Sequence, residues 1–308
     1  MQKSLSAAII GAGSIGGLID TPKSSNTASH AHAYTKESSC SLVAICEPDK
    51  NNQNEFKKRW GELNTYENSS ELFEKENIDI LSISSPTKFH AKNLKEALHV
   101  NTISHILCEK PLVENQKELD ELKTELELND KKILINLIRR YDPSFIQLQT
   151  LINEKKWGKI LDFHGTFTKG LLHNGIHMLA VLSHLLGCVN NVKPLHVNKD
   201  FLVECDNVKG TLTCIENIDY SIFELDIIFE HAKVEIKKGG TKISIYEKTP
   251  SPLYENYFTL THKETLKNTL QHYASNSLSF LLKENSSTCK AILKEHIKLH
   301  EIIYEVIK

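Results

Sequence analysis

The feature that most constrains this chain is a glycine-rich turn placed directly after a short apolar run. Ala7-Ala8-Ile9-Ile10 has the composition of a buried strand, and Gly11-Ala12-Gly13-Ser14-Ile15-Gly16 follows it at once. This G-x-G-x-x-G spacing suits a strand–turn–helix unit, because glycines permit a tight turn and let the backbone approach a pyrophosphate. The amides at the start of the helix then favour the anion. The residues expected to bind such a cofactor are Gly11, Gly13, Ser14, Ile15 and Gly16.

A turn-forming segment interrupts the helix that should follow. Asp20-Thr21-Pro22-Lys23-Ser24-Ser25-Asn26-Thr27 is rich in turn formers, and a helical pattern resumes at His30-Ala31-His32-Ala33-Tyr34. We interpret residues 19–29 as an inserted loop near the phosphate end of the cofactor.

A second apolar run, residues 42–46, ends in Glu47. An acidic side chain at this place can accept hydrogen bonds from the adenosine ribose, and it would repel the extra phosphate of NADP, so Glu47 favours NAD. Glu47 lies 31 residues after Gly16. The usual spacing is about 20 residues, and removing the inserted loop restores it. The other interpretation is a surface acid at the end of a strand.

Strands and helices alternate through the first part of the chain. Strand-like runs at 78–83, 105–108 and 131–136 are separated by helical segments at 91–99 and 112–129. This alternation predicts a parallel, doubly wound sheet of the Rossmann type. We therefore expect a nucleotide-binding domain over residues 1–138.

The pattern changes after residue 138, where strand-like segments predominate. They lie at 159–167, 192–205, 208–216, 220–229, 232–237 and 241–247. Consecutive strands without intervening helices suggest a largely antiparallel open sheet. Helices are expected at 144–155, 175–186, 263–282 and 287–307. We expect a second α/β domain over residues 139–308, with its last helix packing back on the first domain.

Glu109-Lys110-Pro111 ends the strand-like run of residues 105–108. In an open α/β sheet the carboxyl end of a strand opens onto the ligand crevice, so Lys110 should face a site. Proline removes the next backbone donor and stops the strand. A solvated Glu–Lys pair at a strand end is the alternative.

Composition narrows the class of partner and compartment. The formal charge is −2, from 37 basic and 39 acidic side chains, which offers no electrostatic case for binding nucleic acid or an acidic membrane surface. No apolar run approaches the ~20 residues of a membrane span. The seven cysteines form no C-x-x-C pair, which fits a reducing compartment and predicts a cytoplasmic location.

Taken together, these motifs resemble those of the Gfo/Idh/MocA oxidoreductases, the family of glucose–fructose oxidoreductase and inositol dehydrogenase. The segments that carry the resemblance are Gly11–Gly16, Ser84-Ser85-Pro86-Thr87-Lys88-Phe89-His90, Glu109-Lys110-Pro111, Asn136-Leu137-Ile138-Arg139-Arg140-Tyr141-Asp142-Pro143 and Gly175-Ile176-His177. The resemblance implies hydride transfer between NAD(P) and a secondary alcohol or ketone, most often on a sugar. It also implies a homodimer or homotetramer formed through the second sheet.

The resemblance further implies roles for single residues. Lys110 would contact substrate hydroxyls and the nicotinamide, Glu109 would fix the nicotinamide ribose, and His177 would be the acid–base group. Imidazole titrates near neutrality and can serve in either direction of the reaction. The substrate-binding candidates are Arg140, His173 and Asn174. The remaining cofactor-binding candidates are Ser84, Pro86 and His90.

One departure from the family pattern affects the catalytic prediction. The family often has an Asp four residues before the catalytic histidine, and this chain has His173 there. Without that carboxylate the partner that would raise the pKa of His177 is missing. A sensor or regulator that binds a dinucleotide without turnover is therefore the alternative function. His173 and His177 have a spacing that can hold zinc, but no third ligand accompanies them and we expect no metal.

Overall fold

The computed structural model describes residues 4–196, 199–206 and 208–307. By the contacts between its residues the chain divides into two compact units. The first contains the chain up to Ile138 together with Gln271–Glu301, and the second contains Arg139–Leu270 and the residues from Ile302 onward. The segment after residue 270 thus returns to the first unit.

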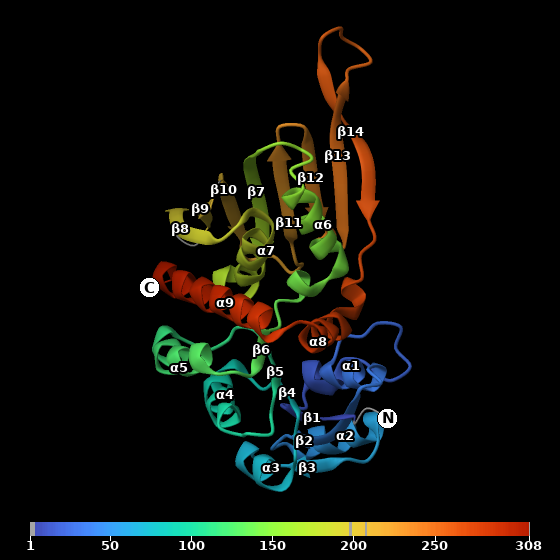
Figure 1. Ribbon diagram of the computed structural model, residues 1–308, viewed down its shortest axis with the longest axis vertical. Helices are drawn as coiled ribbons and strands as arrows, with labels where there is room; N and C mark the ends of the chain where they lie inside the picture. The colour runs from blue at the N-terminus through green and yellow to red at the C-terminus, as the bar shows by residue number, and fades with distance from the viewer. Residues whose placement is uncertain (1–3, 197–198, 207, 308) are drawn as a thin grey trace. The chain divides into compact units, whose positions relative to one another are not determined.

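The first unit is built on a six-stranded parallel sheet (Figure 1). Its strands are β1 (Leu5–Ile10), β2 (Cys40–Cys46), β3 (Asn64–Tyr66), β4 (Ile80–Ile83), β5 (His105–Cys108) and β6 (Lys132–Ile135). The spatial order is β3-β2-β1-β4-β5-β6, so the direction of winding reverses between β1 and β4. Ligands of such sheets bind outside the carboxyl ends of the strands at this reversal. The predicted Rossmann-type sheet is confirmed.

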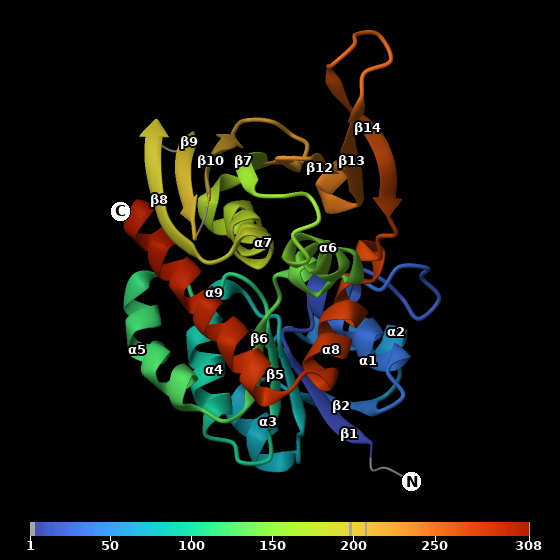
Figure 2. The ribbon, with the colours of Figure 1, turned by 45° about the horizontal axis from the view of Figure 1, so that its top comes forward.

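The helices of the first unit lie between its strands or after residue 270, and the last of them ends in residues that belong to the second unit. They are η1 (Ser14–Leu18), α1 (His30–Lys36), α2 (Lys50–Trp60), α3 (Ser69–Lys75), η2 (Thr87–Phe89), α4 (His90–Leu98), α5 (Gln116–Leu128), α8 (Tyr273–Lys283) and α9 (Ser286–Val306). Helix α8 packs on α1 and on β5 and β6, while α3, α4 and α5 contact one another in a row (Figure 2). Asp49, Asn68 and Asn115 cap the starts of α2, α3 and α5 by accepting backbone N–H bonds.

The second unit contains an eight-stranded sheet. Its strands are β7 (Ile160–Thr168), β8 (Val189–His196), β9 (Asp200–Cys205), β10 (Val208–Ile215), β11 (Phe223–Phe229), β12 (Ala232–Lys237), β13 (Lys242–Pro250) and β14 (Phe258–Leu266). The order is β14-β13-β12-β11-β7-β10-β9-β8. Every pair is antiparallel except β7 with β10. This confirms the predicted largely antiparallel sheet.

Two helices pack in the second unit, α6 (Pro143–Asn153) and α7 (Ile176–Leu186). Helix α7 is buried along its whole length and contacts α6, β7, β8 and β9. A Cβ added to Gly165 on β7 would lie 2.6 Å from Leu212 Cδ2 on β10 and 3.4 Å from Met178 Cε on α7, so the glycine leaves room for the Leu212 side chain. On the partly exposed side of the sheet, Lys233 and Lys237 form ion pairs with Asp226 at 2.9 and 2.8 Å.

Two details of the second unit differ from the sequence-based expectation. Residues 192–205 do not form one strand but fall in two, β8 and β9, which pair with each other in antiparallel register. The helix expected over 263–282 begins only at Tyr273, and residues up to 266 belong to β14. Pairing with β13 decides the conformation of these residues. The β13–β14 hairpin extends beyond the neighbouring strands (Figure 1).

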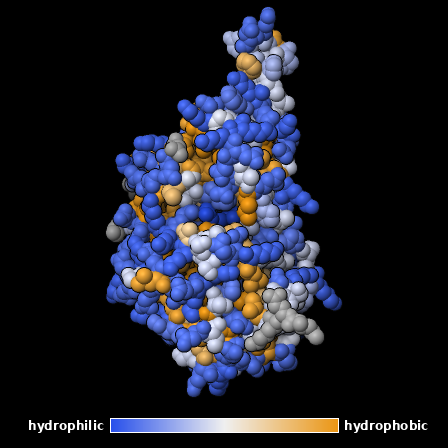
Figure 3. Space-filling model, viewed as in Figure 1, coloured by the Kyte–Doolittle hydropathy of each residue, from blue (hydrophilic) through white to orange (hydrophobic). Residues whose placement is uncertain are grey.

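The surface seen in Figure 3 is mostly hydrophilic, with smaller hydrophobic patches between. Within the described ranges, no helix combines the length and the apolar character needed to cross a membrane.

Candidate functional site

The glycine-rich turn after β1 is shaped by two close backbone approaches. Gly11 has φ +93°, and a Cβ added there would lie 2.4 Å from Ser85 N. A Cβ on Gly16 would lie 2.1 Å from the Gly11 carbonyl oxygen. Gly13 is different, because no atom lies within 4 Å of its ideal Cβ position. The turn therefore packs tightly on one side and leaves an open cradle at Gly13, where a diphosphate can approach the backbone.

Glu47 follows β2 and holds the glycine turn with its side chain. Its Oε2 accepts a hydrogen bond from Ala12 N at 2.9 Å, and its Oε1 accepts one from Asp49 N at 3.1 Å. The Gln53 amide donates to the Glu47 carbonyl at 2.5 Å. The acid predicted to meet the ribose thus lies directly beside the turn predicted to meet the diphosphate.

Residues 19–29 form a loop between η1 and α1, as the sequence predicts. Asp20 closes this loop, since its buried carboxylate accepts hydrogen bonds from Ala28 N, Ser29 N and Ser29 Oγ at 2.7, 3.1 and 2.5 Å. His32 Nδ1 lies 3.1 Å from the same carboxylate. Thr27 exchanges backbone hydrogen bonds with Gln271 and Ala274, which anchors the loop to the start of α8.

The turn after β4 lies against the glycine turn. Ser84 Oγ donates to the Gly11 carbonyl at 2.8 Å. The His90 ring is buried, with Nδ1 2.8 Å from the Pro111 carbonyl and Nε2 2.8 Å from the Ser85 carbonyl. Pro86 is exposed. His90 thus joins the turn after β4 to the segment that contains Glu109 and Lys110.

A buried polar network surrounds Glu109. Its Oε1 accepts a 2.5 Å hydrogen bond from Asn136 Nδ2 and lies 3.2 Å from His30 Nε2. Ser277 Oγ on α8 donates to Asn136 Oδ1 at 2.7 Å. Burial alone would raise the pKa of Glu109. The hydrogen bond and the charge of His30, together with the hydrogen bond from Asn136, outweigh burial and hold this pKa below its ordinary value. Glu109 is therefore a fixed carboxylate beside Lys110.

Sequence reasoning assigned no role to His30, Asn136 or Ser277. Asn136 directly follows β6, so it lies at the same sheet edge as Glu109, and that placement could have identified it. His30 opens the helix that resumes after the inserted loop. Ser277 lies 141 residues from Asn136, and no local pattern connects the two.

Lys110 is partly buried and follows β5 at the carboxyl edge of the first sheet. The next residues are held by α9, where His300 Nε2 accepts the backbone N–H of Leu112 at 3.0 Å. Lys110 therefore projects from a segment fixed on both sides, by Glu109 and by Leu112.

The remaining candidates lie in the second unit. His173 and Asn174 belong to η4 (Leu171–Gly175), and His177 is the second residue of α7, about one turn later. His177 is 8% exposed and His173 is exposed. The structure thus brings these three candidates into one continuous helical segment. Among the residues it describes, no group of three His, Cys, Asp or Glu side chains could hold a metal ion.

Arg140 is partly buried in η3 (Ile138–Tyr141), and its neighbour Arg139 has a structural role. The Arg139 guanidinium stacks on Phe223 at 3.6 Å and donates to the Gly239 carbonyl at 2.7 Å. Burial lowers the pKa of Arg139 to about 10. Of the two adjacent arginines, Arg140 remains the candidate for a substrate contact.

The fold of the first unit, with its open cradle and fixed acid, defines a dinucleotide-binding protein. A comparison with protein-family models agrees, since residues 5–137 match the GFO_IDH_MocA family, described as an oxidoreductase family with an NAD-binding Rossmann fold. The matched residues span the sheet of the first unit, and the match confirms there the resemblance to this oxidoreductase family stated from the sequence.

Individual relatives are distant. Inositol 2-dehydrogenase of Corynebacterium glutamicum strain R is 28% identical over 167 residues, which are 54% of this chain and 46% of that protein. The structure of levoglucosan dehydrogenase in complex with NADH is 14% identical, with a TM-score of 0.75 over 99% of this chain and 97% of that one. A 3-ketoreductase from Actinomadura kijaniata in complex with TDP-benzene and NADP is 16% identical, with a TM-score of 0.73 over 98% and 97%. The two structures share the fold of the whole chain.

Proposed function

We propose that this protein transfers a hydride between NAD and a secondary alcohol or ketone of a sugar or sugar derivative. The observation that carries the proposal is Lys110 beside the fixed carboxylate of Glu109, at the carboxyl edge of a sheet whose glycine turn has an open cradle. The named relatives act on inositol and levoglucosan, which are polyhydroxylated rings.

The preference for NAD rests on Glu47. A diphosphate at Gly13 would place the adenosine ribose near the end of β2, where the Glu47 carboxylate can accept ribose hydroxyls. Its negative charge opposes a phosphate on the same ribose. Structures of this fold hold either NADH or NADP, so the choice depends on the local residues of each chain.

The bound nicotinamide supplies the hydride acceptor or donor. Glu109 would orient the nicotinamide ribose, and the Lys110 ammonium would stabilise negative charge that develops on the substrate oxygen. In alcohol oxidation His177 would take the hydroxyl proton as the hydride leaves carbon, and in ketone reduction it would return that proton. Arg140, His173 and Asn174 would contact other hydroxyls. Ser84, Pro86 and His90 would shape the turn that receives the nicotinamide half of the cofactor.

Assembly and location follow the same proposal. The partly exposed side of the second sheet carries neighbouring negative and positive side chains, namely Asp226, Lys233 and Lys237. In a symmetric dimer the negative groups of one copy of such a surface can pair with the positive groups of the other. We propose a homodimer or homotetramer through this sheet. All seven cysteines are free thiols, which supports a reducing, cytoplasmic location.

The test combines cofactor binding with turnover. Titration with NADH and NADPH should give tighter binding of NADH, followed by NADH oxidation with one member of a panel of keto sugars and sugar nucleotides. Lys110→Ala should abolish turnover and keep NADH binding, while His177→Asn should lower kcat and flatten its pH dependence. Absence of dinucleotide binding would refute the proposal.

Because His173 stands where the family often has an aspartate, a second function is considered, that of a sensor that binds the dinucleotide without turnover. The same experiment distinguishes it from the enzyme. Tight NADH binding with no turnover across the panel would favour a dinucleotide-binding sensor. Restoring the family's residue with His173→Asp would then separate the cases, because an enzyme that lacks only this carboxylate should gain activity.

A further inference from the structure

The second unit contains a cavity of about 890 Å³ that none of the proposed catalytic residues lines. Its walls come from the end of α6, the loop that leads to β7, the end of α7 and the turn after β11. Ligand pockets usually measure about 300–1,000 Å³. Ser183 on its wall follows His177 by six residues of α7, a rise of about 9 Å at 1.5 Å per residue. The cavity is therefore a separate place in the fold.

A buried hydroxyl in its wall has no partner. Ser183 is 7% exposed, and its Oγ makes no hydrogen bond within the described part of the chain. Leaving a buried polar group unpaired destabilises the folded state, so a ligand that pairs with this hydroxyl would be favoured. The adjacent His184 also lines the cavity, where burial and the charge of Arg140 lower its pKa to about 3. This imidazole is neutral and does not repel or attract charge.

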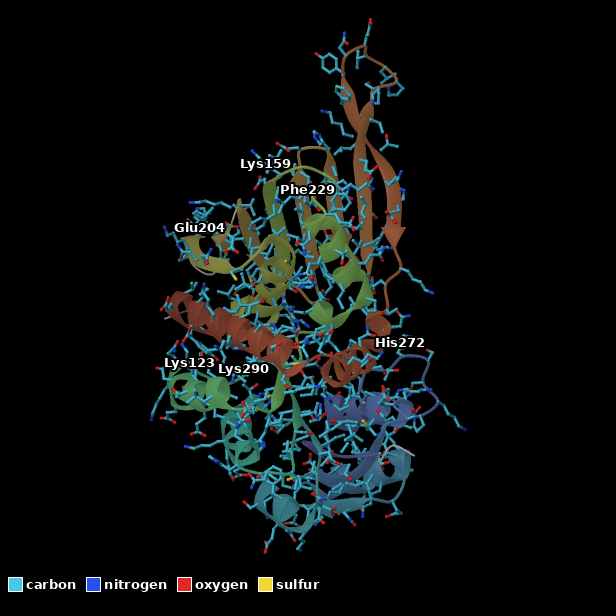
Figure 4. All side chains as sticks on the ribbon, viewed as in Figure 1. Lys123, Lys159, Glu204, Phe229, His272 and Lys290 are labelled. Carbon is cyan, nitrogen blue, oxygen red and sulfur yellow. The ribbon has the colours of Figure 1, made fainter. Side chains whose placement is uncertain are left out.

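The rest of the lining combines apolar and cationic groups. Ile152, Ile160 and Leu185 supply apolar surface. Lys155 and Lys159 are exposed lining residues, and neither ammonium has an ion-pair partner among the residues described. Figure 4 shows Lys159 near Phe229, the residue before Glu230. The Glu230 carboxylate lines the cavity and accepts the backbone N–H of Lys159 at 2.9 Å.

These groups together fit one chemical class. The lining contains two lysines and one carboxylate that already accepts a hydrogen bond, so it has an excess of positive charge and favours an anion. The apolar wall suits a ring or branched body, and Ser183 suits a hydroxyl at its far end. We propose that this cavity binds a small aromatic carboxylic acid that carries a hydroxyl group. The carboxylate meets Lys155 and Lys159, the ring packs on Ile152 and Ile160, and the hydroxyl pairs with Ser183.

The test uses the full chain and 4-hydroxybenzoate as the probe, in isothermal titration calorimetry. One molecule should bind per chain, and the neutral 4-hydroxybenzamide should bind about tenfold more weakly because it lacks the charged contact. Lys159→Met and Lys155→Met should each weaken binding of 4-hydroxybenzoate. The matched control is Lys156→Met, since Lys156 pairs with Glu247 at 3.1 Å and does not line the cavity. This variant should bind normally.

A second comparison isolates the hydroxyl. Ser183→Ala should reduce the affinity for 4-hydroxybenzoate to that for benzoate, while leaving the affinity for benzoate unchanged. Because the change removes an unpaired buried hydroxyl, the variant should fold with unchanged or higher Tm. The proposal is overturned by absence of saturable binding up to about 10 mM, the range of very weak sites. It is equally overturned by binding that NADH displaces and that the three cavity variants do not alter.

Discussion

The side-chain amide of Asn136 donates a 2.5 Å hydrogen bond to Oε1 of Glu109, which joins the residue after β6 to the residue after β5. Ser277 Oγ donates to the other end of the same amide at 2.7 Å. The orientation of Asn136 is therefore set by α8, an element more than a hundred residues further along the chain. Glu109 has its carboxylate fixed before any cofactor binds.

Replacing Asn136 with Asp should reverse the pH dependence of stability at this site. A second carboxylate against Glu109 raises the pKa of the pair, because both charges cannot be held close together. The variant should thus have a lower Tm than the wild type at pH 7 and recover as pH falls and one carboxyl gains a proton. Thermal unfolding between pH 7 and pH 5 measures this. Asn129→Asp, at the end of α5, is the control and should show no such recovery.

In the wild type the stability contributed by this site changes with pH in the opposite direction, since it decreases as pH falls. The folded-state pKa of Glu109 is lowered from 4.5, so its interactions stabilise the protein above that value and are lost as pH falls through the folded-state pKa. Urea unfolding of the wild type and of Glu109→Gln should give free energies that differ most near pH 7 and converge below pH 4.5. A constant difference across that range would mean that the charge of Glu109 contributes nothing.

Two glycine substitutions should separate binding from folding. Gly13 has φ −77° and open space around its Cβ position, so Gly13→Ala should fold with an unchanged Tm. Its methyl group would occupy the cradle and weaken NADH binding by about tenfold or more. Gly17→Ala should do the reverse, because its Cβ would lie 2.2 Å from Phe56 Cε2 and overpack the core. Overpacking costs about 1–3 kcal/mol. Calorimetric Tm and fluorescence titration with NADH measure both effects.

The sequence predicted the elements that local pattern controls. The strand before Gly11, the loop at 19–29 and the acid at Glu47 follow from composition and spacing, and the structure has them where expected. The helix predicted over 263–282 was wrong for its first residues, because pairing with β13 makes residues up to 266 part of β14. The network of Glu109, Asn136 and Ser277 depends on tertiary packing of α8, which no short-range pattern reports.

The same limit applies to the cavity of the second unit. Ser183 and His184 lie within an apolar helical pattern that reads as core packing, and the open space beside them depends on how α6 and the following loop approach α7. The volume of this cavity is set by how the helices and the loop pack together. It could not be predicted from the residues one by one.

Asp20 should contribute strongly to stability although it lies in an inserted loop. Asp20→Ala would remove the carboxylate that accepts the backbone N–H groups of Ala28 and Ser29. Leaving buried donors unpaired costs about 1–3 kcal/mol each. The Tm should fall by several degrees, while Lys23→Ala, an exposed change in the same loop, should leave it unaltered. Equal Tm values for the two variants would mean that the loop closes without Asp20.

Glu47 should set the choice between the two cofactors. Glu47→Gln removes a negative charge beside the ribose site, where two charges about 4 Å apart interact by up to about 4 kcal/mol near a protein surface. The ratio of the NADPH and NADH dissociation constants should therefore fall by about tenfold, which corresponds to only 1.4 kcal/mol. NADH itself should bind more weakly, because the Gln amide cannot accept both the Ala12 and the Asp49 N–H. Glu67→Gln removes the same charge from the surface and should leave the ratio unchanged. A ratio that stays constant in Glu47→Gln would show that cofactor choice depends on other residues of the first unit.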